Sequence, residues 1–256
     1  MSPPSYPSIP GRPLVLGHRG ASAEAPENTL AAFRRAMELG ADGFELDVWR
    51  CGSGEAVVIH DADTARTGQS ALLVKDAPLP RLRKLDVGSW RGEAFAGERI
   101  PTLSEVLATF PAAVVNVEMK AGRVPDLGLA VEVVRTLRQH RAEERVVVSS
   151  FSAALLGAFR SLAPDVATGF LVAPGAIAWA LATTAFRAIR PAGIHLAREL
   201  ATSQRLEAWT RAGVHVLVWT VDDPDEVERL TRLGVSALVS NQPGVAREAV
   251  RRATGA

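Results

Sequence analysis

The chain alternates between short apolar runs and longer amphipathic stretches along nearly its whole length, and this alternation limits its possible folds most strongly. The short runs have the length and the aliphatic, often β-branched content of buried strands. They cover residues 14–17, 43–49, 56–59, 114–120, 145–150, 166–171, 192–196, 214–220 and 236–239. The clearest helical stretches, with apolar residues three and four apart, cover residues 29–39, 127–139, 203–212 and 225–233.

Strands that alternate with helices form a parallel sheet with right-handed crossovers. We predict eight such units closed into a (β/α)8 TIM-type barrel, because the 256 residues match the roughly 250 that this fold needs. A doubly wound open sheet is the second choice. Hydrophobic residues make up 47% of the chain and aromatic residues only 5%, which predicts the aliphatic core of a parallel sheet buried on both faces.

Two segments depart from the alternation. Residues 1–13 are rich in proline and serine and lack an apolar run, so we expect a flexible N-terminal arm and not a signal peptide. Residues from 61 to approximately 100 carry glycine, proline and charge without clear periodicity, over a length that an ordinary connection does not reach. We interpret them as a small insertion after the second strand, on the catalytic face of a single domain that covers residues 14–256.

Charge and cysteine content exclude several classes of protein. The net charge is +1 and no basic block stands out, which argues against a protein that binds nucleic acid through its phosphates. The single cysteine, Cys51, excludes an intrachain disulfide. No apolar stretch reaches the length of a membrane span. We therefore expect a cytoplasmic protein, while the oligomeric state and peripheral membrane binding stay open.

Charged residues gather at the carboxyl ends of the predicted strands, where the active sites of (β/α)8 barrels lie. Glu45 and Asp47 are two residues apart in one strand, and Glu118 and Lys120 in another, so each pair shares a face. If both pairs point inward, three carboxylates converge and repel one another. One divalent cation resolves this repulsion, and ligation by oxygen alone favours Mg²⁺, Ca²⁺ or Mn²⁺ over Zn²⁺.

Two histidines and an arginine stand at the same ends. His18 and Arg19 follow the first strand, and His60 follows the short third run. A cation beside arginine and lysine suits a phosphoryl group, and two histidines can serve as general acid and general base near neutral pH. By spacing alone, an ion pair between Glu118 and Lys120 is an even alternative.

A series of short motifs extends this pattern from about residue 14 to residue 243. The motifs are His18-Arg19-Gly20, Pro26-Glu27-Asn28-Thr29, Glu45-x-Asp47, His60-Asp61, Ile100-Pro101-Thr102-Leu103, Glu118-x-Lys120, Ser150-Phe151 and Trp219-Thr220-Val221. Each motif alone is weak, but in this order they are highly specific. The chain resembles the glycerophosphodiester phosphodiesterase family.

This resemblance implies a distorted (β/α)8 barrel that hydrolyses small glycerophosphodiesters to glycerol 3-phosphate and an alcohol. It implies metal ligands at Glu45, Asp47 and Glu118, an acid/base pair at His18 and His60, phosphate ligands at Arg19 and Lys120, and a substrate contact at Trp219. Two other functions remain as alternatives. One is lysophospholipase D-like hydrolysis, which needs an exposed apolar lip such as residues 171–174 or 176–179, and the other is a non-catalytic sugar-phosphate-binding barrel.

One departure from the family pattern bears on the site. The last strand usually ends in Thr-Asp-x-Pro, whereas this chain reads Ser240-Asn241-Gln242-Pro243. An amide replaces a carboxylate, so a polar contact made there loses its charge. We also expect Asn28 to be an N-cap of the first helix. His195 lies late in its strand and faces either the pocket or the structural core.

Overall fold

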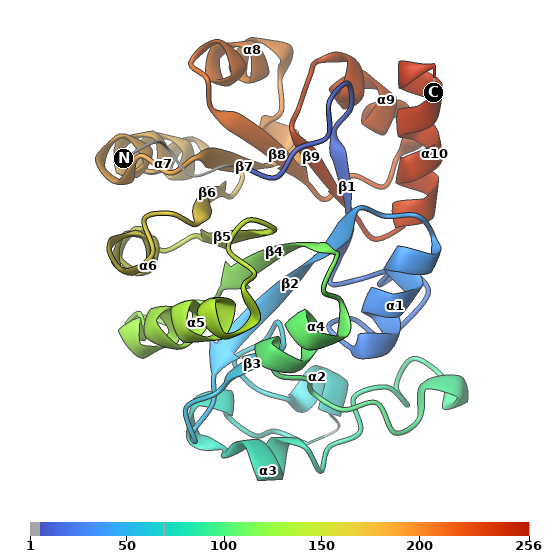
Figure 1. The fold of residues 1–256 in the computed structure, drawn as a ribbon, viewed down its shortest axis with the longest axis vertical. Helices are drawn as coiled ribbons and strands as arrows, with labels where there is room; N and C mark the ends of the chain where they lie inside the picture. Colours follow the sequence, from blue (N-terminus) through green and yellow to red (C-terminus); the bar gives the residue numbers. More distant parts are fainter. Residues whose placement is uncertain (1–5, 69, 256) are drawn as a thin grey trace.

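The computed structural model describes residues 6–68 and 70–255. Within these residues, eight parallel strands close into a barrel with helices around it (Figure 1). Around the barrel the strands are β1 (Leu14–His18), β2 (Gly43–Arg50), β4 (Val114–Met119), β5 (Val146–Ser150), β6 (Ala167–Val172), β7 (Gly193–Ala197), β8 (His215–Trp219) and β9 (Ala237–Ser240). β1 pairs with both β2 and β9, which closes the barrel and confirms the predicted fold.

The third predicted strand, residues 56–59, lies outside the barrel. β3 (Ala56–Val58) runs antiparallel to the end of β2 and forms a hairpin with it. The segment that follows contains two short helices, α2 (Ala65–Gly68) and α3 (Leu79–Leu82), and packs beneath β3 in Figure 1. Its core is a small cluster of its own, which includes Val57, Val74 and Leu82. The predicted insertion is therefore an ordered extension of the β2–β3 hairpin.

The barrel helices pack their apolar faces against the strands, and this layer forms the main core. They are α1 (Leu30–Glu38), α4 (Leu103–Thr109), α5 (Leu127–His140), α6 (Ala153–Leu162), α7 (Ala176–Ile189), α8 (Ser203–Arg211), α9 (Pro224–Arg232) and α10 (Pro243–Thr254). The N-cap of α1 is Thr29 and not Asn28, because the Thr29 hydroxyl accepts the Ala32 N–H. No helix in the described part of the chain is long and apolar enough to span a membrane.

The amino-terminal end of the barrel is filled by the ring of Tyr6. Its hydroxyl lies 3.1 Å from Nε2 of His195, and its ring stacks on His215 with the centroids 4.4 Å apart. Burial lowers the pKa of His195 to about 3, so this histidine is a neutral core residue. The structural alternative for His195 is therefore the right one. From Tyr6 onward the segment also differs from the expected loose arm, because one aromatic side chain supplies the apolar contact that its prolines and serines lack.

Candidate active site

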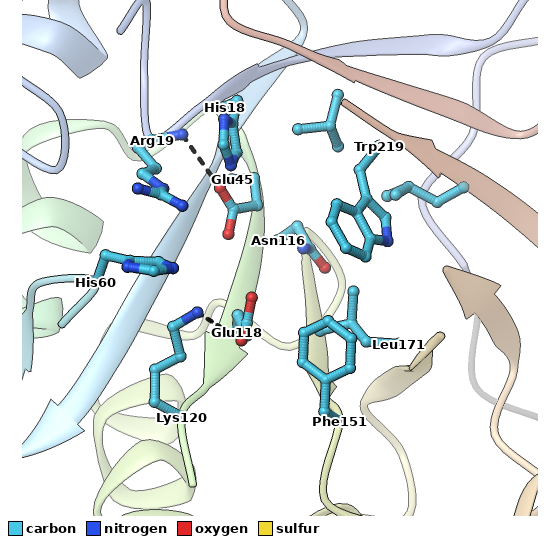
Figure 2. Close-up of a pocket in the computed structure, with 12 residues that line it drawn as sticks. His18, Arg19, Glu45, His60, Asn116, Glu118, Lys120, Phe151, Leu171 and Trp219 are labelled. Carbon is cyan, nitrogen blue, oxygen red and sulfur yellow. Dashed lines mark hydrogen bonds and ion pairs between the residues drawn. The ribbon is translucent and has the colours of Figure 1, made fainter. Parts of the chain in front are cut away.

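A cavity of about 230 Å³ opens at the carboxyl ends of the barrel strands, and its two sides differ in character (Figure 2). Charged and polar side chains from β1, β2, β4 and the segment after β3 line one side. They are His18, Arg19, Glu45, His60, Asn116, Glu118 and Lys120. The other side, here called the apolar wall, consists of Phe151, Leu171, Leu217, Trp219 and Val239. The cavity can thus hold a molecule with one anionic and one less polar part.

Three carboxylates converge on the charged side of the cavity. Glu45 and Asp47 come from β2 and Glu118 from β4, with Asp47 and Glu118 directly opposite in the parallel register. Each offers an oxygen within 4.8 Å of the others, and all three residues are buried. Their convergence follows from the two-residue spacing along β2. We call Glu45, Asp47 and Glu118 the acidic cluster.

Cationic and amide groups surround the acidic cluster. Lys120 Nζ lies 2.8 Å from Glu118 Oε1 and 2.9 Å from Asp47 Oδ1. Arg19 Nε lies 3.3 Å from Asp47 Oδ2, and the Asn28 side-chain amide donates to the same oxygen at 2.9 Å. The Lys120–Glu118 ion pair considered as an alternative is therefore present, together with the carboxylate convergence. Asp47 is held on both of its oxygens.

These contacts shift the pKa values of the three carboxyl groups of the acidic cluster in different directions. Burial alone would raise the pKa of Asp47, but the charges of Lys120 and Arg19 outweigh it and hold the pKa at about 2. Burial, and then the charge of Asp47, raise the pKa of Glu118 to about 7. Burial, and then the charges of Asp47 and Glu118, raise the pKa of Glu45 well above its ordinary value. The cluster thus holds three ionised carboxylates only if further positive charge enters, and its hard oxygen donors fit a divalent cation.

Each of the two histidines has one ring nitrogen held by a neighbour. His18 Nδ1 lies 2.7 Å from the side-chain oxygen of Asn241, and His60 Nδ1 lies 2.8 Å from Asp61 Oδ1. Both rings line the cavity (Figure 2). Nε2 is therefore the ring nitrogen that each histidine can offer to a bound molecule.

Arg19 links the first barrel strand to the insertion. Its backbone N–H donates to Glu45 at 3.1 Å, and its guanidinium donates to Glu27 at 2.8 Å. Arg66, from α2, binds the same Glu27 and also Asp61, each at 2.7 Å. The insertion thus fixes the carboxylates behind both Arg19 and His60. Sequence reasoning missed these roles of Glu27, Asn28 and Arg66, although the first two lie in a quoted motif.

Trp219 anchors the apolar wall. Its indole N–H donates to the backbone oxygen of His195 at 3.2 Å, and its ring meets Phe151 edge-on with centroids 5.8 Å apart. Facing it, Asn116 reaches the cavity with a buried side-chain oxygen that has no hydrogen-bond partner in the described structure. Its amide nitrogen donates to the Ser149 hydroxyl at 3.3 Å.

A (β/α)8 barrel with this combination of carboxylates, histidines and cationic side chains defines a class of enzymes that act on phosphate esters. Residues 18–245 match the model of the glycerophosphoryl diester phosphodiesterase family. The chain belongs to this family, as its ordered motifs indicate.

Relatives extend over almost the whole chain. A glycerophosphodiester phosphodiesterase of Caldanaerobacter subterraneus is 39% identical over 244 residues, which cover 93% of this chain and 98% of the relative. One from Bacillus subtilis is 30% identical and covers 91% of this chain and 85% of the relative. A phosphodiesterase structure from Oleispira antarctica, in complex with its product sn-glycerol-3-phosphate, superposes with a TM-score of 0.85 at 31% identity over 93% of this chain and 97% of that one.

Proposed function

We propose that this protein hydrolyses glycerophosphodiesters to glycerol 3-phosphate and an alcohol, with one divalent cation, Mg²⁺, Ca²⁺ or Mn²⁺, held by the acidic cluster. The observation that carries the proposal is the meeting of Glu45, Asp47 and Glu118 within 4.8 Å, where Glu45 and Glu118 line a cavity that His18 and His60 also line. The family of the chain and the product bound to the Oleispira relative support the same reaction.

The charged side of the cavity neutralises the phosphodiester anion. Arg19 and Lys120 are the cationic side chains that line it, and each is oriented by Asp47. A divalent cation held by Glu45, Asp47 and Glu118 would supply further positive charge, which would make the phosphorus easier to attack. These contacts position the phosphoryl group between the two histidines.

His18 and His60 handle the two protons of the reaction. One histidine accepts the proton of the attacking oxygen as the new P–O bond forms. The other gives a proton to the alcohol oxygen as the old P–O bond breaks. The attacking oxygen belongs either to the neighbouring glycerol hydroxyl, which yields a cyclic phosphate that water then opens, or directly to water. Phosphorus NMR of the reaction mixture distinguishes the routes, since only the first produces a cyclic intermediate.

A coupled assay for released glycerol 3-phosphate tests the proposed function. We expect turnover of glycerophosphocholine, glycerophosphoethanolamine and glycerophosphoglycerol by the metal-loaded protein. No release of glycerol 3-phosphate from any of them, by folded protein with bound metal, would contradict the proposal. A sugar-phosphate-binding barrel without activity would instead bind glycerol 3-phosphate and leave every diester intact.

Trp219 is expected to hold the glycerol carbons or a cationic headgroup against its ring. Trp219→Ala should remove about 1 kcal/mol of transition-state binding, roughly a fivefold loss in kcat/KM. Trp219→Phe keeps an aromatic face while losing the hydrogen bond to the His195 carbonyl oxygen, so it should retain most of the rate. Steady-state kinetics on the same diesters measures both variants. Unchanged kcat/KM in Trp219→Ala would limit this residue to packing.

One observation favours a second substrate class, the lysophospholipids. A groove of about 290 Å³ adjoins the cavity and shares Phe151 and Leu171 with it. The described residues that line the groove all have apolar side chains, and Phe151 is 44% exposed at the junction. Residues 171–173 of the expected lip line this groove, whereas Trp179 packs under Arg205 and the side chains of residues 176–178 lie outside the described part. An acyl chain on the glycerol part of the substrate would extend from the apolar wall into this groove.

Filling the groove tests this second function. Ala185 lines the groove on α7, so Ala185→Trp should lower kcat/KM for lysophosphatidylcholine severalfold and leave glycerophosphocholine unaffected. Ala188→Trp, on an exposed part of the same helix, is the matched control. Equal kcat/KM of the two variants for the lysolipid would contradict an acyl-binding groove.

A further inference from the structure

The loop after β8 places a carboxylate behind the end of β9. β8 and β9 are parallel neighbours beside β1, so the residues that follow them meet at the same end of the barrel (Figure 1). Asp222 accepts three hydrogen bonds there. Its Oδ1 accepts from the Asn241 backbone N–H at 2.7 Å and from the Ser240 hydroxyl at 2.8 Å, and its Oδ2 accepts from the Asn241 side-chain nitrogen at 2.6 Å. Asp222 thus holds Asn241 by backbone and side chain.

These hydrogen bonds decide which way the Asn241 amide points. A carboxylate only accepts hydrogen bonds, so the NH₂ group of Asn241 must face Asp222. The amide oxygen then faces the other way, where the Ser22 hydroxyl donates to it at 2.8 Å and His18 Nδ1 lies 2.7 Å away. An amide oxygen cannot donate, so Nδ1 of His18 must carry the hydrogen.

The tautomer of His18 follows from this chain of contacts. In a neutral imidazole only one ring nitrogen carries a hydrogen. With the hydrogen on Nδ1, the Nε2 of His18 has a free lone pair in the cavity. At His60 the acceptor on Nδ1 is the Asp61 carboxylate itself, at 2.8 Å, with no amide between them. The Nδ1 atoms of the two histidines are therefore held by different groups, a neutral amide at His18 and a carboxylate at His60.

We infer that Asp222 is a positioning residue that acts through Asn241 to fix the tautomer and ring orientation of His18, so that Nε2 meets the substrate as a proton acceptor. The inference rests on the proposed function for its catalytic consequence. Asn241, where the family usually has a carboxylate, is thus an amide whose orientation is set by the carboxylate of Asp222.

Asp222→Asn removes the carboxylate that orients the Asn241 amide without changing the size of the side chain. The new amide no longer requires the Asn241 NH₂ group, so Asn241 can turn and present that group to His18, which favours the wrong tautomer. Loss of such a supporting contact typically costs about tenfold to a hundredfold in rate. We expect kcat to fall by this factor with KM within about twofold of the original. Asp223→Asn is the matched control, because Asp223 is exposed and caps α9 without touching Asn241.

Exchanging the carboxylate and the amide between residues 222 and 241 should restore activity. Asn241→Asp alone should also lose activity, because it places two carboxylates at the 2.6 Å contact between residues 241 and 222. In the double variant Asp222→Asn/Asn241→Asp, a carboxylate accepts the hydrogen of His18 Nδ1 and the amide of residue 222 supports it. We expect kcat to return to within severalfold of the original. If the kcat of the double variant does not exceed the kcat of both single variants, Asp222 does not act through Asn241 and the inference is wrong.

Nitrogen-15 NMR of the histidine rings reads the tautomer without any reaction. The Mg²⁺-loaded protein should show His18 with hydrogen on Nδ1, and Asp222→Asn should shift part of the population to the Nε2 tautomer. A wild-type His18 with hydrogen on Nε2, or an unchanged tautomer in Asp222→Asn, would overturn the inference even if the protein cleaves glycerophosphodiesters. Absence of diesterase activity with the expected tautomers would instead contradict the proposed function alone.

Discussion

Replacing either His18 or His60 with alanine should lower kcat/KM for a glycerophosphodiester by about a hundred- to ten-thousand-fold, the usual contribution of a general acid or base. Both rings line the cavity, and each has Nδ1 engaged by a neighbour and Nε2 left for the substrate. His140→Ala is the matched control, because His140 ends α5 and contacts the Ser104 hydroxyl instead of the cavity. Near-normal rates in both active-site variants would contradict the proposed mechanism.

The leaving group separates the two roles. A nitrophenyl diester has a good leaving group that needs little protonation, so it should restore much of the lost rate when the general acid is missing. The tautomer inferred for His18 makes its Nε2 the proton acceptor, which leaves His60 as the general acid, acting in its protonated form with hydrogen on both ring nitrogens. We therefore expect rescue of His60→Ala and none of His18→Ala. Equal rescue of the two variants, or rescue of His18→Ala alone, would contradict this division.

Removal of the cation should have an effect at least as large. In excess chelator we expect turnover to fall below detection and to return with Mg²⁺, Ca²⁺ or Mn²⁺, because the acidic cluster repels itself without added positive charge. Glu118→Gln should weaken metal binding while the barrel stays folded, as measured by calorimetric titration and circular dichroism. Full activity in chelator, with no metal found by elemental analysis, would contradict the site.

The acidic cluster also predicts a pH dependence. In the metal-free protein, burial and the charge of Asp47 raise the pKa of Glu118 to about 7, above its unfolded value of 4.5. Stability from this group is therefore present below about pH 4.5 and is lost as the pH rises through about 7. A bound cation removes this loss and displaces the proton. The gain in Tm on adding Mg²⁺ should thus be larger near pH 8 than near pH 5, and a constant gain would contradict it.

The strands were predictable because the length of an apolar run and its aliphatic content are both local features of the sequence. Every predicted run overlaps an observed strand, with ends that differ by no more than one residue. The common face of Glu45 and Asp47 was predictable for the same reason, since residues two apart on a strand point to the same side. The antiparallel pairing of β3 was not, because an apolar run of three residues carries no sign of its partner.

The supporting contacts were not predictable, because they join loops that are distant in sequence. Asp222 meets Asn241 only after β8 and β9 pair, and Tyr6 finds His195 across 189 residues. The Asn28 amide was expected at a helix N-cap, yet the positive φ of 58° at this residue turns its side chain toward Asp47. Such contacts form only when the barrel closes, and the periodicity of the sequence does not indicate them.

A crystal grown with Mn²⁺ and glycerol 3-phosphate tests the central claim most directly, because anomalous scattering locates the ion independently of any assay. We predict one strong anomalous peak among the oxygens of Glu45, Asp47 and Glu118, with the phosphate of the product beside it and within reach of His18 and His60. An anomalous map without a peak at the acidic cluster, in a crystal whose cavity holds glycerol 3-phosphate, would contradict the account.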